Sequence, residues 1–361
     1  MAIRQLSLNN FRNLISTTVD LDANLNIITG LNGSGKTSFL EALHIICQGR
    51  SFKTHSINHC IQHKKNSFLL FSLFDTYKAG ISRNKKTTTI RIDNETIYKV
   101  SSLAKKTPVR IINSDSFDLI IGTPGHKREY IDWCLFHVEH NYHSLWSDYK
   151  HSLKQRNALL KSRKNLSELN YWDKNISDLG ESIFKLRKNN IKSLQLILDQ
   201  EFPEITRHLN IELVYKPGWN INFSLIENLN TTRNKDIKQG YTLCGIHRDN
   251  IEILSNSLLA QNVLSRGEIK KLSIVLIISQ IYLVQKSNNR NIIILIDDID
   301  SELDEDSVKY ILNKLNNNKI QLFITNIKNK QYLSQSHEEY KMFHVEHGMI
   351  KAVKHIREQN V

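Results

Sequence analysis

The chain has 361 residues, of which 40% are hydrophobic and 24% charged, and its formal net charge at pH 7 is +13. This composition is typical of a globular protein of about two domains and excludes collagen-like and low-complexity chains. No apolar run reaches the ~18 residues that a membrane span requires, and residues 1–5 do not resemble a signal peptide.

The sequence pattern of the N-terminal part predicts strands, then one helix and then more strands. Residues 3–8 and 25–29 are short β-rich runs, and residues 39–46 have apolar side chains at helical spacing. Basic loops separate three further β-like runs, which we expect to form an antiparallel sheet: 68–73, 87–92 and 109–112.

The middle of the chain predicts long helices. Between residues 126 and 208 the only proline is Pro203 and the only glycine is Gly180, and apolar residues recur at helical spacing. We therefore expect a helical hairpin inserted into an α/β domain. Its outgoing arm carries six basic residues, which either form a solvated face or contact a polyanion: Lys150, Lys154, Arg156, Lys161, Arg163 and Lys164.

The α/β pattern returns after Gly240. The expected elements are a helix over 268–284, a strand over 291–296, a helix from residue 305, a strand over 321–325, and a closing hairpin of 342–345 and 349–353 around Gly348.

The net charge and the cysteines indicate what kind of binding partner the protein has and in which cellular compartment it lies. The excess of basic residues favours a polyanion, either nucleic acid or an anionic membrane surface. The four cysteines are far apart and none forms a C-x-x-C pair, so we expect buried thiols in a reducing cytoplasm.

The strongest motif is a phosphate-binding loop of the form G-x-x-x-x-G-K-[ST], placed between a predicted strand and a predicted helix. Glycines let the backbone N–H groups turn inward toward phosphate oxygens, and the helix start adds its positive dipole end. Lys36 is expected to reach the β- and γ-phosphates and Thr37 to bind Mg²⁺. The loop consists of Gly30, Leu31, Asn32, Gly33, Ser34, Gly35, Lys36 and Thr37.

A second motif is an apolar strand that ends in two aspartates. Asp297 is expected to hold Mg²⁺, and Asp298 to orient or deprotonate an attacking water. The alternative is that both aspartates only cap the helix that begins near residues 301–304. Most of the chain separates this strand from the phosphate loop, so a large insertion must divide one nucleotide site.

The third motif opens the long helix that precedes the acidic strand. Ser265, Arg266 and Gly267 lie at its start, where Ser265 has the N-cap position and Gly267 leaves the backbone open. This predicts a second anion-binding helix terminus. An ordinary capping box explains the same residues equally well.

The order of these motifs resembles the ABC-type ATPases, and within their SMC-like branch the RecF family. The resemblance covers nearly the whole chain. It includes segments at 6–13, 49–54, 130–139, 154–157, 264–267 and 297–304. One departure is Asn250, which stands where the family usually has an aspartate.

The resemblance implies the fold class and the domain organisation. It implies an α/β, ABC-type P-loop ATPase head, in which a mixed sheet has flanking helices and an antiparallel β subdomain accompanies it. A helical arm, or lid, is inserted into this head. The expected domains are 1–123 for the first half of the head, 124–210 for the arm and 211–361 for the second half.

The resemblance also implies a shared nucleotide site. ATP would lie between the phosphate loop of one subunit and Ser265, Arg266 and Gly267 of the other, with Asp304 in the loop that follows the acidic strand. ABC-type ATPases often have a γ-phosphate sensor at the position of Thr325 and Asn326, and whether these residues have that role stays open.

The implied function is an ATP-dependent DNA-binding protein of recombinational repair. Its partners would be single-stranded, gapped or junction DNA, RecO and RecR, and a second copy of the chain bound through ATP. It would assist RecA loading and hydrolyse ATP weakly. The alternative is the nucleotide-binding subunit of a membrane transporter, which shares the three motifs.

Overall fold

The computed structural model describes residues 2–316, 319–325 and 340–353. The chain forms two compact units. Unit 1 consists of Met1–Ser116 and Asn288–Val361, and unit 2 of Phe117–Ser287. Residues 211–287, which we expected in the head, thus belong to unit 2, because strand β9 (Ile211–Lys216) pairs with strand β10 (Asn250–Ser255) and packs against a helix of the arm.

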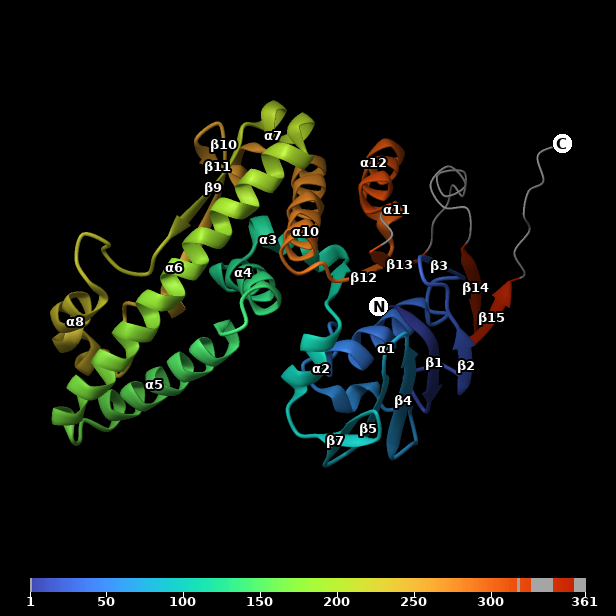
Figure 1. Ribbon diagram of the computed structural model, residues 1–361, viewed down its shortest axis with the longest axis horizontal. Coiled ribbons are helices and arrows are strands. Elements are labelled where there is room, and N and C mark those ends of the chain that lie inside the picture. Colours follow the sequence, from blue (N-terminus) through green and yellow to red (C-terminus); the bar gives the residue numbers. More distant parts are fainter. Residues whose placement is uncertain (1, 317–318, 326–339, 354–361) are drawn as a thin grey trace. The chain divides into compact units, whose positions relative to one another are not determined.

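The first sheet of unit 1 is antiparallel throughout, with the order β2-β1-β4-β5-β6-β7 (Figure 1). Buried and exposed side chains alternate along β4, as expected for a sheet with one covered face. The strands are β1 (Ile3–Asn9), β2 (Thr17–Asp20), β4 (Ser67–Phe74), β5 (Lys78–Asn84), β6 (Thr88–Ile92) and β7 (Glu95–Ile97).

The second sheet of unit 1 is mostly parallel, with the order β15-β14-β3-β13-β12-β8. Among the strands described, only β14 and β15 pair in the antiparallel direction, and their hairpin surrounds Gly348 as predicted. The strands are β3 (Leu25–Thr29), β8 (Val109–Ile112), β12 (Ile292–Ile296), β13 (Ile320–Thr325), β14 (Lys341–Glu346) and β15 (Met349–Val353). The expectation that 109–112 joins the antiparallel sheet was wrong, since β8 pairs in parallel with β12.

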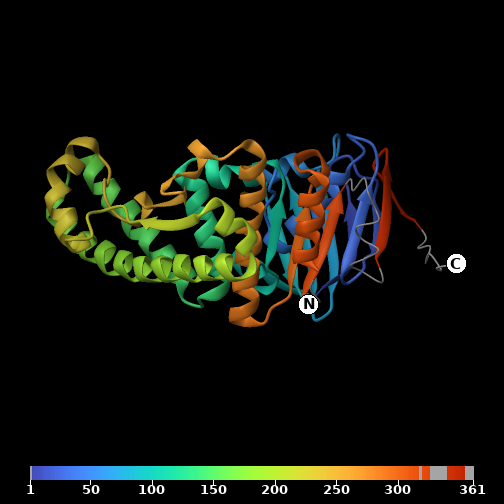
Figure 2. The same cartoon turned by 90° about the horizontal axis from the view of Figure 1, so that it is seen from above.

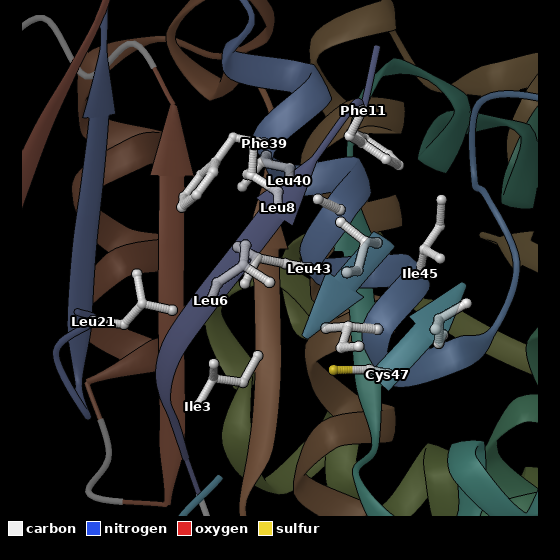
Figure 3. Close-up of a cluster of buried hydrophobic side chains, with 14 of the residues drawn as sticks. Ile3, Leu6, Leu8, Phe11, Leu21, Phe39, Leu40, Leu43, Ile45 and Cys47 are labelled. Carbon is white, nitrogen blue, oxygen red and sulfur yellow. The ribbon is translucent and has the colours of Figure 1, made fainter. Parts of the chain in front are cut away.

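Helix α1 (Lys36–Gln48) shares one hydrophobic core with both sheets of unit 1. Figure 3 shows Leu6 and Leu8 of β1 beside Leu40 and Leu43 of α1. Phe39 of α1 also lies near Phe343 of β14, with ring centroids 6.1 Å apart. In the described part of this unit, the remaining helices are η1 (Ile57–Cys60), α2 (Val100–Lys106), α11 (Ile299–Glu302) and α12 (Glu305–Leu315).

Unit 2 is built around two long helices, α5 (Tyr142–Ser162) and α6 (Leu169–Glu201), which pack as the predicted hairpin (Figures 1 and 2). A three-stranded antiparallel sheet of order β11-β10-β9 accompanies them, with β11 at Leu258–Leu259. The other helices are α3 (Asp118–Ile121), α4 (Pro124–Val138), η3 (Leu166–Glu168), α7 (Pro203–Leu209), α8 (Leu225–Gln239), η4 (Ile246–Arg248), α9 (Ala260–Val263) and α10 (Arg266–Asn288), and η2 (Ser114–Phe117) precedes them.

Two fully buried arginines hold the helices of unit 2 together. Arg156 of α5 forms ion pairs with Asp173 of α6 at 2.5 Å and with Asp236 of α8 at 2.7 Å. Arg187 of α6 pairs with Asp249 at 2.5 Å. Arg156 therefore cannot be part of a solvated or polyanion-binding face of the arm, because its side chain is 0% exposed and its charge is already paired.

The four cysteines are buried, as predicted. Within the described ranges, no helix is both long enough and apolar enough to span a membrane.

The burial of His44 in α1 predicts that acid lowers the stability of the folded chain. His44 is 8% exposed, its Nδ1 donates to the carbonyl oxygen of Arg50 at 2.8 Å, and burial lowers its pKa to about 4. In the unfolded chain His44 takes up a proton near pH 6.5, whereas in the folded chain it stays neutral until about pH 4. The free energy of unfolding is therefore unaffected by His44 above pH 6.5 and decreases as the pH falls below that value. We expect His44 to cost about 2 kcal/mol of unfolding free energy between pH 7 and pH 5.

Urea unfolding at several pH values checks this. His44→Asn should show a smaller loss between pH 7 and pH 5 than the unchanged chain, whereas replacing the exposed His55 by Asn should leave the loss unchanged. An equal loss in all three proteins would contradict the assignment to His44.

Candidate functional site

A cleft of about 420 Å³ opens in unit 1 near the carboxyl ends of the parallel strands, where ligands bind in open α/β sheets. The phosphate loop follows β3 and the two aspartates follow β12, so pairing through β13 brings them together. The cleft is lined by Asn13, Asn32, Gly33, Gly35, Lys36, Thr37, Ser38, Lys53, Asp297 and Asp298.

The curl of the phosphate loop depends on glycine. Gly30, Gly33 and Gly35 have φ values of +146°, +79° and +122°, which residues with a side chain rarely adopt. At Gly30 the packing is also too close for a side chain, because a Cβ would lie 2.2 Å from the carbonyl oxygen of Val345 in β14. The β14–β15 turn supports the loop further, since Gly348 N–H donates to the Ser34 carbonyl at 3.0 Å.

Lys36 begins α1 and folds back over the loop. Its Nζ donates to the carbonyl oxygens of Gly30 at 2.9 Å and Leu31 at 2.8 Å. Burial lowers the pKa of Lys36, and the negative charges of Asp298 and Asp297 oppose part of that shift. The ammonium group thus sits at the mouth of the loop with two carboxylates nearby.

Asp297 joins three segments of unit 1. Its Oδ2 accepts a hydrogen bond from Thr37 Oγ1 at 2.8 Å, and its Oδ1 accepts one from Thr325 Oγ1, also at 2.8 Å. Thr325 is fully buried and its Oγ1 also accepts from the backbone N–H of Asp298 at 2.8 Å. Asp298 itself has a left-handed backbone, with φ +59°, a conformation that aspartate tolerates better than most residues. Asn326 lies outside the described residues.

Three residues of the cleft lining were missed by sequence reasoning, namely Asn13, Ser38 and Lys53. Asn13 donates from Nδ2 to the Gly33 carbonyl at 3.2 Å and accepts from Ser38 Oγ at 2.9 Å. Lys53 supplies a second cation to the cleft lining. Asn13 and Lys53 lie in segments that carry the family resemblance, and Ser38 follows the phosphate loop, but no local spacing rule marked any of the three as a site residue.

The remaining predicted site residues are not part of the cleft lining. Ser265, Arg266 and Gly267 are exposed in unit 2, where Ser265 and Glu268 form a reciprocal capping box: Ser265 N–H donates to Glu268 Oε2 at 2.8 Å, and Glu268 N–H to Ser265 Oγ at 3.3 Å. A Cβ at Gly267 would meet no atom within 4 Å. Asp304 is exposed in unit 1 and caps α12 by accepting from Ser307 N–H at 2.8 Å.

The chemistry of the cleft suits a phosphate chain with a divalent cation. A helix N-terminus and two lysines favour anions. The Ser34 hydroxyl is buried with no hydrogen-bond partner in the described part of the chain, so the loop holds an unsatisfied polar atom. Thr37 and Asp297 present the hard oxygen ligands that Mg²⁺ prefers. These residues therefore fit both a nucleotide and Mg²⁺.

Comparisons with known families agree with this fold. The chain matches the model of the AAA ATPase domain over residues 1–197 and that of the RecF/RecN/SMC N terminal domain over residues 174–351. The matches therefore extend through both compact units.

Whole-chain relatives are similar across nearly their full length. The DNA replication and repair protein RecF of Pseudoalteromonas translucida is 35% identical over 359 residues, covering 96% of this chain and 99% of the relative. Its counterpart in Acinetobacter baylyi is 33% identical over 359 residues, covering 98% and 100%.

Solved structures share the fold. A structure of the recombination mediator protein RecF-ATP in the RecFOR pathway superimposes with a TM-score of 0.87 at 23% identity, covering 98% of each chain. An Smc head bound to the C-winged helix domain of ScpA has a TM-score of 0.59 at 13% identity, covering 99% of each chain. The predicted ABC-type architecture is thus confirmed.

The loop geometry predicts unequal effects of two glycine substitutions. Gly33→Ala places a Cβ in open space and should cost only the left-handed backbone strain, about 1 kcal/mol of unfolding free energy. Gly30→Ala adds a clash with the backbone of β14 and should cost about 3 kcal/mol. Urea unfolding of both variants measures the difference, and equal losses would show that β14 does not constrain the loop.

Proposed function

The chain belongs to the RecF family of DNA replication and repair proteins, and we propose that it is an ATP-dependent DNA-binding protein of recombinational repair and replication restart. The observation that carries the proposal is the hydrogen-bonded pair of Thr37 and Asp297 beside the phosphate loop. This pair would supply Mg²⁺ ligands at the γ-phosphate end of the proposed nucleotide site.

The proposed ligands are ATP and Mg²⁺. The loop of residues 30–37 would bind the phosphates, with Lys36 at the β- and γ-phosphates, and Thr37 and Asp297 would hold the cation. Bound Mg²⁺ would neutralise charge that develops on the phosphates. Asp298 is the candidate to orient or deprotonate water, because it follows Asp297 and lines the same cleft. We propose weak, DNA-stimulated hydrolysis that acts mainly as a switch.

The proposed active form is a homodimer held together by ATP. Each nucleotide would lie between the phosphate loop of one copy and Ser265, Arg266 and Gly267 of the other, with Asp304 nearby. Two observations support this arrangement. The start of α10 is exposed, and its capping box leaves the open backbone at Gly267 unobstructed.

The proposed nucleic-acid partner is single-stranded, gapped or junction DNA. The net charge of +13 supports a polyanionic partner. Co-operation with RecO and RecR in RecA loading, in the cytoplasm, is part of the same proposal and rests on family membership. The same membership disfavours the alternative of a transporter's nucleotide-binding subunit.

A mixing experiment tests the shared site. Lys36→Met removes the phosphate-binding cation and Ser265→Arg blocks the opposing helix start, so each variant alone should lose ATPase activity. A mixture should regain part of the activity, because one of its two sites combines an intact loop with an intact helix start. Phosphate release across mixing ratios measures this, with circular dichroism to show that both variants fold. No recovery at any ratio would mean that each chain works alone.

DNA binding should depend on the nucleotide. At one fixed salt concentration, we expect ATP with Mg²⁺ to strengthen binding to gapped DNA at least tenfold, and Lys36→Met to abolish this gain. Fluorescence anisotropy with labelled gapped DNA measures it, and intact duplex is the matched control. Equal binding with and without nucleotide would mean that the basic charge alone attracts DNA.

A further inference from the structure

A buried carboxylate lies in the middle of α1, away from the cleft lining. Glu41 is 0% exposed. Arg12 donates two hydrogen bonds to it, from Nε to Oε2 at 2.8 Å and from Nη2 to Oε1 at 2.7 Å. Two further donors share Oε1, namely the hydroxyl of Ser51 at 2.5 Å and the thiol of Cys60 at 3.4 Å.

Arg12 and Ser51 belong to two separate loops that carry residues of the cleft lining, and Cys60 ends helix η1. Arg12 immediately precedes Asn13, whose side chain bonds to Gly33 and Ser38 of the phosphate-loop region. Ser51 accepts hydrogen bonds on its Oγ from the backbone N–H of Lys53 at 2.9 Å and of Thr54 at 3.0 Å. One carboxylate therefore fixes both loops to the helix that starts at Lys36.

The electrostatics keep this carboxylate ionised. Burial raises the pKa of Glu41, but the hydrogen bonds from Arg12 and Ser51 and the charge of Arg12 outweigh it, so the pKa lies below its usual range. An ionised carboxylate is a pure acceptor and can serve all of its donors at once. A buried charge of this kind persists only when it is fully paired.

We propose that Glu41 is a positioning residue. It acts through Ser51, and it holds Lys53 against the phosphates of a nucleotide in the cleft. Lys53 has a long, flexible side chain, and an exposed lysine binds an anion weakly unless its backbone is fixed. The turn closed by Ser51 supplies that constraint. The inference rests on the proposed function, since it requires ATP in this cleft.

Two matched substitutions test the proposal. Ser51→Ala and Cys60→Ala each remove one donor from Oε1 of Glu41, but only Ser51 is bonded to the turn that carries Lys53. We expect Ser51→Ala to weaken binding of a fluorescent ATP analogue with Mg²⁺ three- to tenfold, and Cys60→Ala to change it less than twofold. Equal weakening by both variants, or none by Ser51→Ala, overturns the proposal.

A double-mutant comparison shows whether Ser51 acts through Lys53. If it does, Ser51→Ala added to Lys53→Met should weaken binding by less than a further twofold. Independent, multiplicative losses overturn the proposal. Thermal unfolding without nucleotide accompanies each variant, because a merely structural role would lower the melting temperature without this non-additivity.

Lys36→Met separates this inference from the proposed function. If the unchanged chain binds the analogue and Lys36→Met does not, the nucleotide site stands, and the Ser51 and Lys53 variants decide the role of Glu41. If the unchanged chain does not bind, or Lys36→Met binds equally well, the proposed function fails and the positioning role is overturned with it.

Discussion

The carboxylate of Asp297 is the constraint on which the site depends. It accepts hydrogen bonds from Thr37 at the start of α1 and from Thr325 at the end of β13. These three residues meet only because β13 lies between β3 and β12 in the parallel sheet. The pairing of strands, and not their order along the chain, therefore assembles the cleft. This explains how a whole second unit can be inserted between the phosphate loop and the acidic strand.

The residues that border the cleft are supported by groups that do not line it. Helix α1 shares its core with both sheets, so its first turn has little freedom to move. Glu41, buried within that helix, is bonded to the two loops that carry Asn13 and Lys53. The β14–β15 turn supports the phosphate loop from another side through Gly348. A site that recognises phosphate by distance and direction benefits from such rigid support.

The helices of unit 2 are held together partly by buried charge. Arg156 and Arg187 are each fully buried and joined to aspartates on other segments. Breaking such a pair leaves an uncompensated buried charge, which gives the packing a strong preference for one arrangement. Because Asp173, Asp236 and Asp249 are buried together with these arginines, the ion pairs do not reduce the net charge of +13.

Local patterns in the sequence were sufficient for the phosphate loop, the acidic strand, the hairpin at Gly348 and the helix start at Ser265. Each is specified within a few residues, by glycine at positive φ, by an apolar run that ends in carboxylates, or by a serine and a glutamate three positions apart. Tertiary structure alone decided that β8 joins the parallel sheet, that residues 211–287 pack in unit 2 and that Arg156 is buried. It also decided that Asn13 and Lys53 reach the cleft. These outcomes depend on which distant segments pair in space, and backbone propensity and spacing along the chain carry no information about that choice.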